Sequence, residues 1–365
     1  MAAAVTWVLG VDSGGSGLRV ALADAANPAL TESAASGSTA SGTQASVSLV
    51  SESVVSRVPV RTGPRGIEAA HLLEQLLPMA GELLGRAGGA GVSAVAIGAA
   101  GMATLGDDLR AELPAALERS LGVRRLALAA DAVTAYAGAL GQRPGAVVAA
   151  GTGMIALGTD LTRWRRADGW GHLLGDCGGG AWIGRAGLEA GMRAYDGRRG
   201  GSAALLERLE AVFGPAAGLP GALYPRSDRP AVLASFAPEV ARCAASDPVA
   251  AAILREAARQ IAEAAAAVCP PESPGSSGPS APAESSGSRP RCEVALTGGL
   301  FKMGDPLLTP AREEFAALLP YARPVPAAGD PLVGAVLIAS ALATESLRLP
   351  PHPQLLRVVT EQDTR

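Results

Sequence analysis

Short apolar runs separated by polar breaks occur along the first half of the chain, and they predict β-strands. The clearest runs are VTWVLGV (5–11), LRVALAD (18–24), VSAVAIG (92–98), RRLALAAD (124–131) and GAVVAAGTGM (145–154). Between them, residues 66–87 and 107–121 carry apolar positions at helical spacing. Strands that alternate with helices in this order predict the α/β class with a mixed sheet.

The second half of the chain is more helical. Its apolar spacing predicts helices at 180–196, 201–213, 231–244, 248–268, 304–319 and 329–347. Residues 270–291 are rich in Pro, Ser and Gly and have almost no apolar side chains, so we expect a disordered surface insertion there. The predicted domains are residues 1–121 and 122–346, followed by a tail at 347–365.

Composition narrows the function classes. A net charge of −3 over 365 residues predicts no nucleic-acid partner and no anionic-membrane partner. Lys302 is the only lysine and is not in a GK[ST] sequence, which excludes a Walker-type phosphate loop. The four cysteines, Cys177, Cys243, Cys269 and Cys292, show no CxxC pair, so we expect reduced, unpaired thiols in a soluble cytoplasmic protein.

Three predicted strands end in glycine-rich turns. These turns are Asp12 with Gly14, Gly15 and Ser16, then Gly151, Thr152 and Gly153, and finally Gly298 with Gly299. Backbone N–H groups in such turns can bind phosphate, and an aspartate beside one can hold Mg²⁺. A tight hairpin explains any single turn equally well. Three in this order, with the acid-ended strand at Asp131 between the first two, favour a phosphate site.

A longer motif carries a family resemblance. The stretch GWGHLLGDCGGGAWIGRAGLEA (169–190) is close to the pattern GWG-LLGDEGS-YWIG. With the glycine turns, it makes the chain resemble the BadF/BadG/BcrA/BcrD-type ATPases of the sugar kinase–Hsp70–actin superfamily, and most of all their N-acetylglucosamine kinases. The resemblance covers residues 5–345 apart from 270–291. It implies two actin-like (ribonuclease H-like) α/β domains with a nucleotide cleft between them.

The resemblance also implies roles for individual residues. It makes Asp131 the catalytic base, whereas capping preference alone makes it a helix cap. It implies ATP-binding roles for Asp12, Gly14, Gly15, Ser16, Gly151, Thr152, Gly153, Gly298 and Gly299, with Mg²⁺ near Asp12. It implies substrate-binding roles for Asp131, Trp170, Gly171 and Asp176, to which we add the hydroxyls of Ser38 and Thr39. The alternatives are core packing for Trp170 and an Asx-turn for Asp176.

Two residues depart from the family pattern. Met154 replaces the serine of GTGS, which predicts a weaker contact with phosphate. Cys177 replaces the glutamate of GDEGS, so the specificity for the sugar is expected to differ from that of the family. The predicted function is ATP-dependent phosphorylation of the 6-hydroxyl of an amino sugar. N-acetylglucosamine is the first candidate substrate. N-acetylmuramic acid, glucosamine and glucose are alternative substrates. A partner-activating ATPase and a non-catalytic sugar sensor are alternative classes, and the resemblance implies a homodimer.

Overall fold

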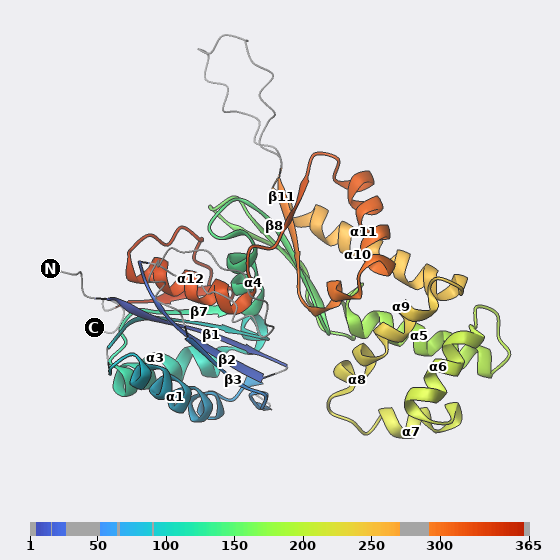
Figure 1. Cartoon of the computed structure of the whole chain (residues 1–365), viewed down its shortest axis with the longest axis horizontal. Helices are drawn as coiled ribbons and strands as arrows, with labels where there is room; N and C mark the ends of the chain where they lie inside the picture. The colour runs from blue at the N-terminus through green and yellow to red at the C-terminus, as the bar shows by residue number, and fades with distance from the viewer. Residues whose placement is uncertain are drawn as a thin grey trace, which may run out of the picture. The chain divides into compact units, whose positions relative to one another are not determined.

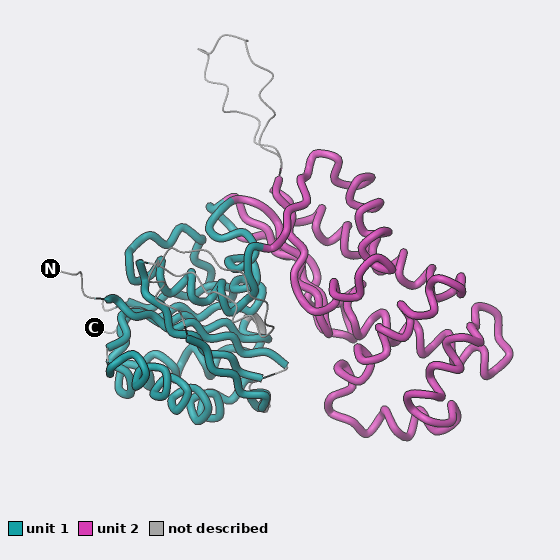
Figure 2. The backbone as a smooth tube through the Cα atoms, viewed as in Figure 1, with its two compact units in different colours: residues 1–143, 161–163, 328–365 teal, residues 144–160, 164–327 magenta. Residues whose placement is uncertain are grey.

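The computed structural model divides the chain into two compact units. It describes residues 5–15, 17–26, 52–63, 66–89, 91–270 and 292–360. Unit 1 consists of residues 1–143, 161–163 and 328–365, and unit 2 of residues 144–160 and 164–327 (Figure 2). The predicted insertion, apart from Pro270, lies outside the described residues, as do Ser16, Ser38 and Thr39.

A mixed sheet is the centre of unit 1. Among the described residues it has six strands in the order β13-β7-β6-β1-β2-β3. Their bounds are β1 (Trp7–Gly14), β2 (Gly17–Asp24), β3 (Glu52–Ser56), β6 (Val92–Ala99), β7 (Leu126–Ala130) and β13 (Leu356–Val359). Strands β1, β6 and β7 run parallel, whereas β2 returns antiparallel to β1. The carboxyl ends of the three parallel strands therefore meet at one edge.

Helices cover both faces of this sheet (Figure 1). Helices α1 (Ala69–Arg86) and α3 (Asp107–Leu121) lie on one face, and α4 (Asp131–Leu140) and α12 (Pro331–Ala343) on the other. The short elements are β4 (Thr62–Gly63), β5 (Gly66–Ile67) and α2 (Met102–Leu105). Helices α4 and α12 cross with their backbones in contact, because a Cβ at Gly334 would overlap the carbonyl of Thr134. The crossing fixes α4, which begins with Asp131.

Unit 2 combines a second sheet with a helical cluster. Its described strands have the order β10-β9-β8-β11-β12. Their bounds are β8 (Gly145–Ala150), β9 (Met154–Thr159), β10 (Trp164–Asp168), β11 (Glu293–Thr297) and β12 (Arg323–Pro326). The helices are α5 (Gly180–Tyr195), α6 (Ala203–Phe213), η1 (Ala216–Gly218), α7 (Leu219–Leu223), α8 (Arg229–Ser235), α9 (Ala237–Cys243), α10 (Pro248–Val268), η2 (Gly299–Met303) and α11 (Asp305–Leu318). Buried side chains such as Val148, Ile183 and Ile261 join sheet and helices in one core.

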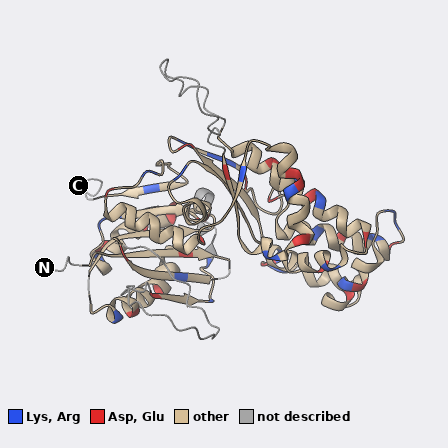
Figure 3. Ribbon diagram, turned by 45° about the horizontal axis from the view of Figure 1, so that its top comes forward, with Lys and Arg blue, Asp and Glu red and all other residues tan. Residues whose placement is uncertain are grey.

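Charges of both signs are mixed along the helices of unit 2 (Figure 3). On α10, for example, Arg259 forms ion pairs with Glu256 and Glu263. Such pairs contribute little to stability at a surface, because solvent screens the charges. Among the described helices, none combines the length and the apolar character needed to cross a bilayer.

Several elements differ from those predicted. The helix expected at 231–244 is two helices, α8 and α9, because Pro238 lies in the first turn of α9 and has no N–H to continue a helix. Strands β10, β12 and β13 were not predicted. Strand β10 reads WRRAD and β12 reads RPVP, so neither shows an apolar run.

The compact units divide the chain differently from the predicted domains. The boundary expected at residues 121 and 122 separates β6 from β7, yet these strands are parallel neighbours in one sheet. Strand β7 and helix α4 therefore belong to unit 1. The predicted tail at 347–365 also contributes to unit 1, because β13 pairs antiparallel with β7.

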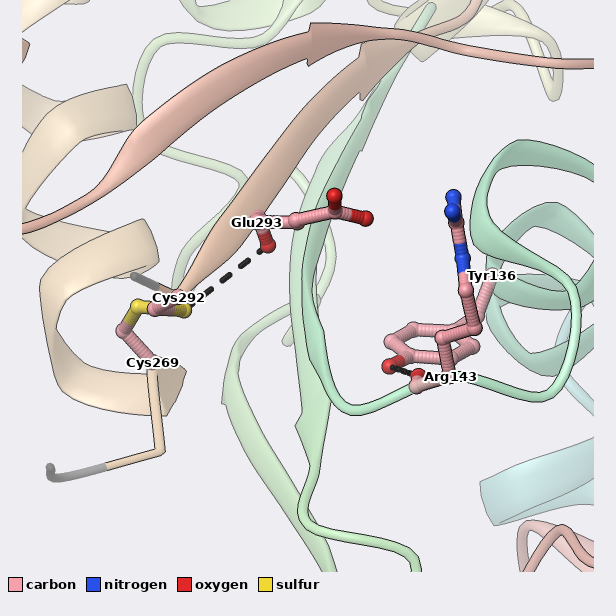
Figure 4. The surroundings of a disulfide bond; sticks show 5 residues. All are labelled: Tyr136, Arg143, Cys269, Cys292 and Glu293. Carbon is pink, nitrogen blue, oxygen red and sulfur yellow. Dashed lines mark hydrogen bonds between the residues drawn. A yellow bond between two sulfur atoms is a disulfide. The ribbon is translucent and has the colours of Figure 1, made fainter. Parts of the chain in front are cut away.

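Two of the four cysteines are paired, contrary to the prediction (Figure 4). Cys269 and Cys292 form a disulfide, whereas Cys177 and Cys243 are free. Helix α10 ends directly before Cys269, and strand β11 begins directly after Cys292. The expectation of unpaired thiols was wrong because packing brings together two cysteines that are 23 positions apart.

Candidate functional site

Two carboxylates lie at the carboxyl edge of the unit 1 sheet. Asp12 belongs to β1, and Asp131 follows β7 as the first residue of α4. Strand β6 lies between them, with Gly98 opposite Asp12. Since neighbouring strands are about 4.8 Å apart, β1 and β7 are about 10 Å apart across the sheet. Ligands of open α/β sheets bind at this edge.

Asp131 is held at the start of α4 by local contacts. Its Oδ1 accepts a hydrogen bond from the N–H of Ala132 at 2.9 Å, and its carbonyl oxygen accepts from the Thr134 hydroxyl at 2.9 Å. Thr134 is fully buried, and a Cβ at Gly98 would overlap its side chain. Helix α4 therefore packs directly on β6. The half-buried Asp131 side chain supports the first turn of the helix and is partly open to a ligand.

Arg19, which sequence reasoning missed, ties Asp12 to the start of α12. The register of β1 and β2 places it opposite Asp12. Its Nε and Nη2 donate to Oδ2 of Asp12 at 3.0 and 2.6 Å, and its Nη1 donates to Asp330. Asp330 also caps α12 by accepting from the N–H of Val333 at 3.0 Å. The hairpin turn at Gly14–Gly17 is the signal that would have found Arg19, because it fixes this register.

The environment of Asp12 suits a carboxylate that binds a metal ion. Burial raises the pKa of Asp12, and the guanidinium of Arg19 opposes that shift. Mg²⁺ prefers oxygen ligands and uses one or two carboxylates together with substrate phosphates and water. Asp12 and Asp330 supply two such carboxylates around Arg19. In the described part of the chain, no group of three or more His, Cys, Asp or Glu residues could hold a metal. The donor set therefore fits Mg²⁺ that arrives with phosphates.

In unit 2, the Gly151–Gly153 turn connects β8 to β9 and contacts the beginning of α5. The N–H of Gly180 donates to the carbonyl of Gly151 at 2.9 Å, and the N–H of Ala181 donates to the carbonyl of Thr152 at 2.8 Å. The first turn of the helix therefore holds the glycine turn by its carbonyl groups.

The Gly298–Gly299 turn lies beside the Gly151–Gly153 turn. Strand β11 runs parallel to β8, with Thr297 opposite Ala149. Gly298 has a φ of +107°, and a Cβ there would overlap the carbonyl of Ala150. Two of the three predicted glycine turns are therefore neighbours at one edge of the unit 2 sheet.

Glycines of the turns differ in why they lack a side chain. Gly153 faces the carboxylate of Asp176, and Gly298 is both close-packed and left-handed, so internal packing explains them. Four others have ordinary φ angles, and a Cβ on them would meet no described atom within 4 Å. These four are Gly14, Gly15, Gly151 and Gly299. The backbone at these four positions is therefore open to the close approach of a ligand.

The loop after β10 gathers the predicted substrate residues of unit 2. Trp170 is 60% exposed, which contradicts core packing, and the guanidinium of Arg166 lies 4.3 Å from the centroid of its ring. Asp176 has a φ of +55°, and its Oδ1 accepts from the N–H of Gly171 at 3.1 Å. Burial raises the pKa of Asp176. Its carboxylate packs against Gly153, so the loop reaches the predicted phosphate turn.

Asp168 is a second residue that sequence reasoning missed. It ends β10 with a φ of +61°. Its Oδ1 accepts from the N–H of Asp176 at 2.6 Å, and its Oδ2 accepts from the N–H of Cys177 at 2.9 Å. The sequence offered one signal for it, an aspartate directly before the GWG motif.

The two departures from the family pattern lie in different surroundings. Met154 is 2% exposed and packs in the core of unit 2, so its side chain faces the interior. Cys177 is half-buried beside Asp168, and burial raises the pKa of its thiol. The Met154 departure therefore changes core packing, whereas the Cys177 departure lies in the loop that carries Trp170 and Asp176.

The predicted site residues fall into two described groups. Unit 1 holds Asp12, Gly14, Gly15 and Asp131. Unit 2 holds Gly151, Thr152, Gly153, Trp170, Gly171, Asp176, Gly298 and Gly299. Each group gathers at one sheet edge or in a loop beside it. Ser16, Ser38 and Thr39 lie outside the described residues.

Comparison with known proteins assigns the chain to a family. Residues 9–339 match the sequence profile of the BadF/BadG/BcrA/BcrD ATPase family. The match spans most of the chain, so the chain belongs to this family.

Individual proteins resemble the chain over part of its sequence or in its fold. The chain is 37% identical to an N-acetylmuramic acid/N-acetylglucosamine kinase of Clostridium acetobutylicum over 108 residues, which is 29% of this chain and 34% of that protein. The chain thus matches about a third of the length of this curated relative. A Chromobacterium violaceum structure assigned provisionally as an N-acetylglucosamine kinase superposes with a TM-score of 0.65 at 26% identity, over 93% of this chain and 99% of the other.

A third likeness concerns the fold alone. The ROK family glucokinase of Streptomyces griseus, solved with glucose and AMPPNP, superposes with a TM-score of 0.52 at 19% identity, over 93% of this chain and 99% of that chain. The predicted fold class, α/β with two actin-like domains, is confirmed by these likenesses and by the two sheets.

Proposed function

We propose that this protein is an ATP-dependent sugar kinase that phosphorylates the 6-hydroxyl of an amino sugar, with N-acetylglucosamine as the first candidate. Family membership supports the use of ATP. The observation that carries the proposal is the placement of Asp12 and Asp131 at the carboxyl ends of parallel strands in one sheet. Phosphoryl transfer needs this combination of a carboxylate for the metal and a carboxylate for the acceptor hydroxyl.

Unit 2 contributes the nucleotide contacts in this proposal. The turn of Gly151, Thr152 and Gly153 binds phosphate oxygens through the N–H groups of Thr152 and Gly153, because the N–H of Gly151 donates to the carbonyl of Gly153 at 2.9 Å. Gly298 and Gly299 face the adenosine. The exposed backbone at Gly151 and Gly299 supports these roles. Trp170, Gly171 and Asp176 bind the sugar, and the exposed ring of Trp170 suits stacking on an apolar sugar face.

Unit 1 contributes the reacting groups. Asp131 accepts the proton of the sugar hydroxyl as it attacks the terminal phosphate. Asp12 holds Mg²⁺, and Asp330 is the second carboxylate within reach of the same Arg19. When bound beside Asp12, Mg²⁺ would offset the negative charge of the phosphates. Arg19 keeps the Asp12 carboxylate in one orientation.

The identity of the sugar is the finer part of the proposal. The Clostridium acetobutylicum relative is named for both N-acetylmuramic acid and N-acetylglucosamine, which supports an N-acetylated amino sugar. Glucosamine and glucose stay as alternatives. The cytoplasmic location and the homodimer remain predictions.

The test is ADP release from Mg-ATP against a panel of N-acetylglucosamine, N-acetylmuramic acid, glucosamine, N-acetylmannosamine and glucose. We expect one N-acetylated sugar to drive ADP release, and Asp131→Asn to reduce kcat by about 10²–10⁴-fold. Asparagine keeps an oxygen that can accept from the N–H of Ala132, so this variant separates the base from the helix contact.

Asp107→Asn is the matched control, because Asp107 also begins a helix and its side chain is 96% exposed. It should keep the turnover of the wild type. Sugar-independent ADP release would favour the partner-activating ATPase, and sugar binding without ADP release would favour the sensor.

A further inference from the structure

The loop after β10 is organised around one carboxylate that has no role in the proposed chemistry. Both oxygens of Asp168 accept backbone hydrogen bonds, one from Asp176 and one from Cys177, eight and nine positions along the chain. Such bonds to a charged acceptor are stronger than neutral ones. Asp168 therefore closes the loop on itself and fixes the backbone at Asp176.

A second layer of contacts holds Asp168 from the other side. Arg166 donates through Nε to the carbonyl of Asp168 at 3.0 Å and through Nη2 to the carbonyl of Gly169. A Cβ at Gly175 would overlap the carboxylate of Asp168. The carboxylate is therefore packed on one side by backbone, with little freedom to move.

Asp176 transmits this order to the predicted phosphate turn. Its backbone is left-handed, with a φ of +55°, a conformation that is uncommon for residues other than glycine but that aspartate adopts more readily than most. The N–H that Asp168 binds belongs to this residue. The Asp176 carboxylate leaves no room for a Cβ at Gly153. A change in the backbone at Asp176 would thus move a group that touches the Gly151–Gly153 turn.

We propose that Asp168 is a positioning residue that fixes Asp176 and, through it, the Gly151–Gly153 turn in the conformation that binds ATP. The ATP-binding part of this inference rests on the proposed function. The contact part rests on the loop alone. Asp168 itself touches neither the nucleotide nor the sugar in this scheme.

Two variants of Asp168 remove its hydrogen bonds to different extents. Asp168→Asn keeps one acceptor oxygen and tolerates a positive φ, and Asp168→Gly removes both acceptors while suiting the φ of +61°. Glu189→Gln is the matched control, because Glu189 is an exposed carboxylate on α5 of the same unit that bonds Arg193 at the helix surface.

Two readouts are measured on each full-length variant. Amide hydrogen exchange of Asp176 and Cys177 should accelerate by about tenfold or more in Asp168→Gly and less in Asp168→Asn. The dissociation constant for ATP, measured by calorimetry, should rise in the same order, by about tenfold in Asp168→Gly. The unfolding temperature identifies any variant that fails to fold, and Asp168→Asn then carries the comparison.

The inference is overturned if Asp168→Gly exchanges these amides and binds ATP as Glu189→Gln does. It is also overturned if exchange accelerates while the affinity for ATP stays at the wild-type value, because Asp176 would then not fix the turn in its ATP-binding conformation. A wild-type protein that binds no ATP would refute the proposed function, and the exchange rates would still decide whether Asp168 holds Asp176.

Discussion

At the scale of single residues, the candidate site of unit 1 depends on one arginine that is hydrogen-bonded to two aspartates. Arg19 bonds Asp12 through two nitrogens and Asp330 through a third. The Asp12 side chain is only 14% exposed, so its charge is poorly hydrated. The Asp12 carboxylate is therefore placed to bind a second cation, such as Mg²⁺, beside Arg19.

This arrangement predicts the pH dependence of stability at Asp12. Burial raises its pKa above the ordinary 3.8, so the folded state holds this proton more tightly than the unfolded chain does. The resulting stabilisation is complete below the ordinary pKa and is lost as the pH rises through the raised one. Asp12→Asn removes this titration.

The measurement is thermal unfolding of wild type and Asp12→Asn without Mg²⁺, from about pH 4 to about pH 7. The unfolding temperature of the variant minus that of the wild type should increase as the pH rises. A difference that decreases over this range would show that Arg19 outweighs burial.

At the scale of elements, glycines decide how closely helices approach. A Cβ at Gly138 of α4 would overlap the carbonyl of Asp330, and a Cβ at Gly334 of α12 would overlap that of Thr134. The two helices therefore touch backbone to backbone. This contact places the start of α4, with Asp131, and the start of α12, with Asp330, in fixed positions within unit 1.

Gly334→Ala tests this crossing. The new methyl group meets backbone that cannot rotate away, so we expect a loss of about 1–3 kcal/mol or more in the free energy of unfolding. Gly81→Ala is the control, because Gly81 lies in α1 with open space where a Cβ would be. It should stabilise by about 0.5–1 kcal/mol through helix propensity. Chemical denaturation compares the two, and equal effects would mean that α12 shifts freely.

At the scale of the whole molecule, the chain leaves unit 1 after residue 143, re-enters it only at residues 161–163, and returns to it at residue 328. The excursion includes the disulfide between Cys269 and Cys292. A cross-link stabilises mainly by restricting the unfolded chain, and it joins two elements of the unit 2 core here. Its contribution therefore belongs to the stability of unit 2.

Reduction of this disulfide should destabilise unit 2. For cysteines 23 positions apart, chain entropy gives about 3 kcal/mol. We expect the wild type in a dithiol reductant and the Cys269→Ser/Cys292→Ser variant to unfold at the same, lower denaturant concentration. Cys177→Ser, which leaves the disulfide intact, serves as the control. Equal stability with and without reductant would contradict this prediction.

Much of the local structure follows from the sequence. The apolar runs at 5–11, 18–24 and 92–98 are strands β1, β2 and β6, and helical spacing located α1 and α3. The strands read as continuous apolar runs because almost all of their residues are buried, whereas α1 and α3 show helical spacing because each buries one side. Strands such as β10 and β13 were missed, because neither shows a long apolar run and tertiary neighbours supply their pairing.

The sequence by itself determined the class of the fold, the glycine turns and the acids at two strand ends, because these depend on periodicity and on the chemistry of a few adjacent residues. Tertiary structure alone decided that Arg19 meets Asp330, that Asp168 holds Asp176 and that Cys269 meets Cys292. Each of those contacts depends on sheet register or on the path of a loop. Both are fixed by packing between segments, which no local pattern encodes.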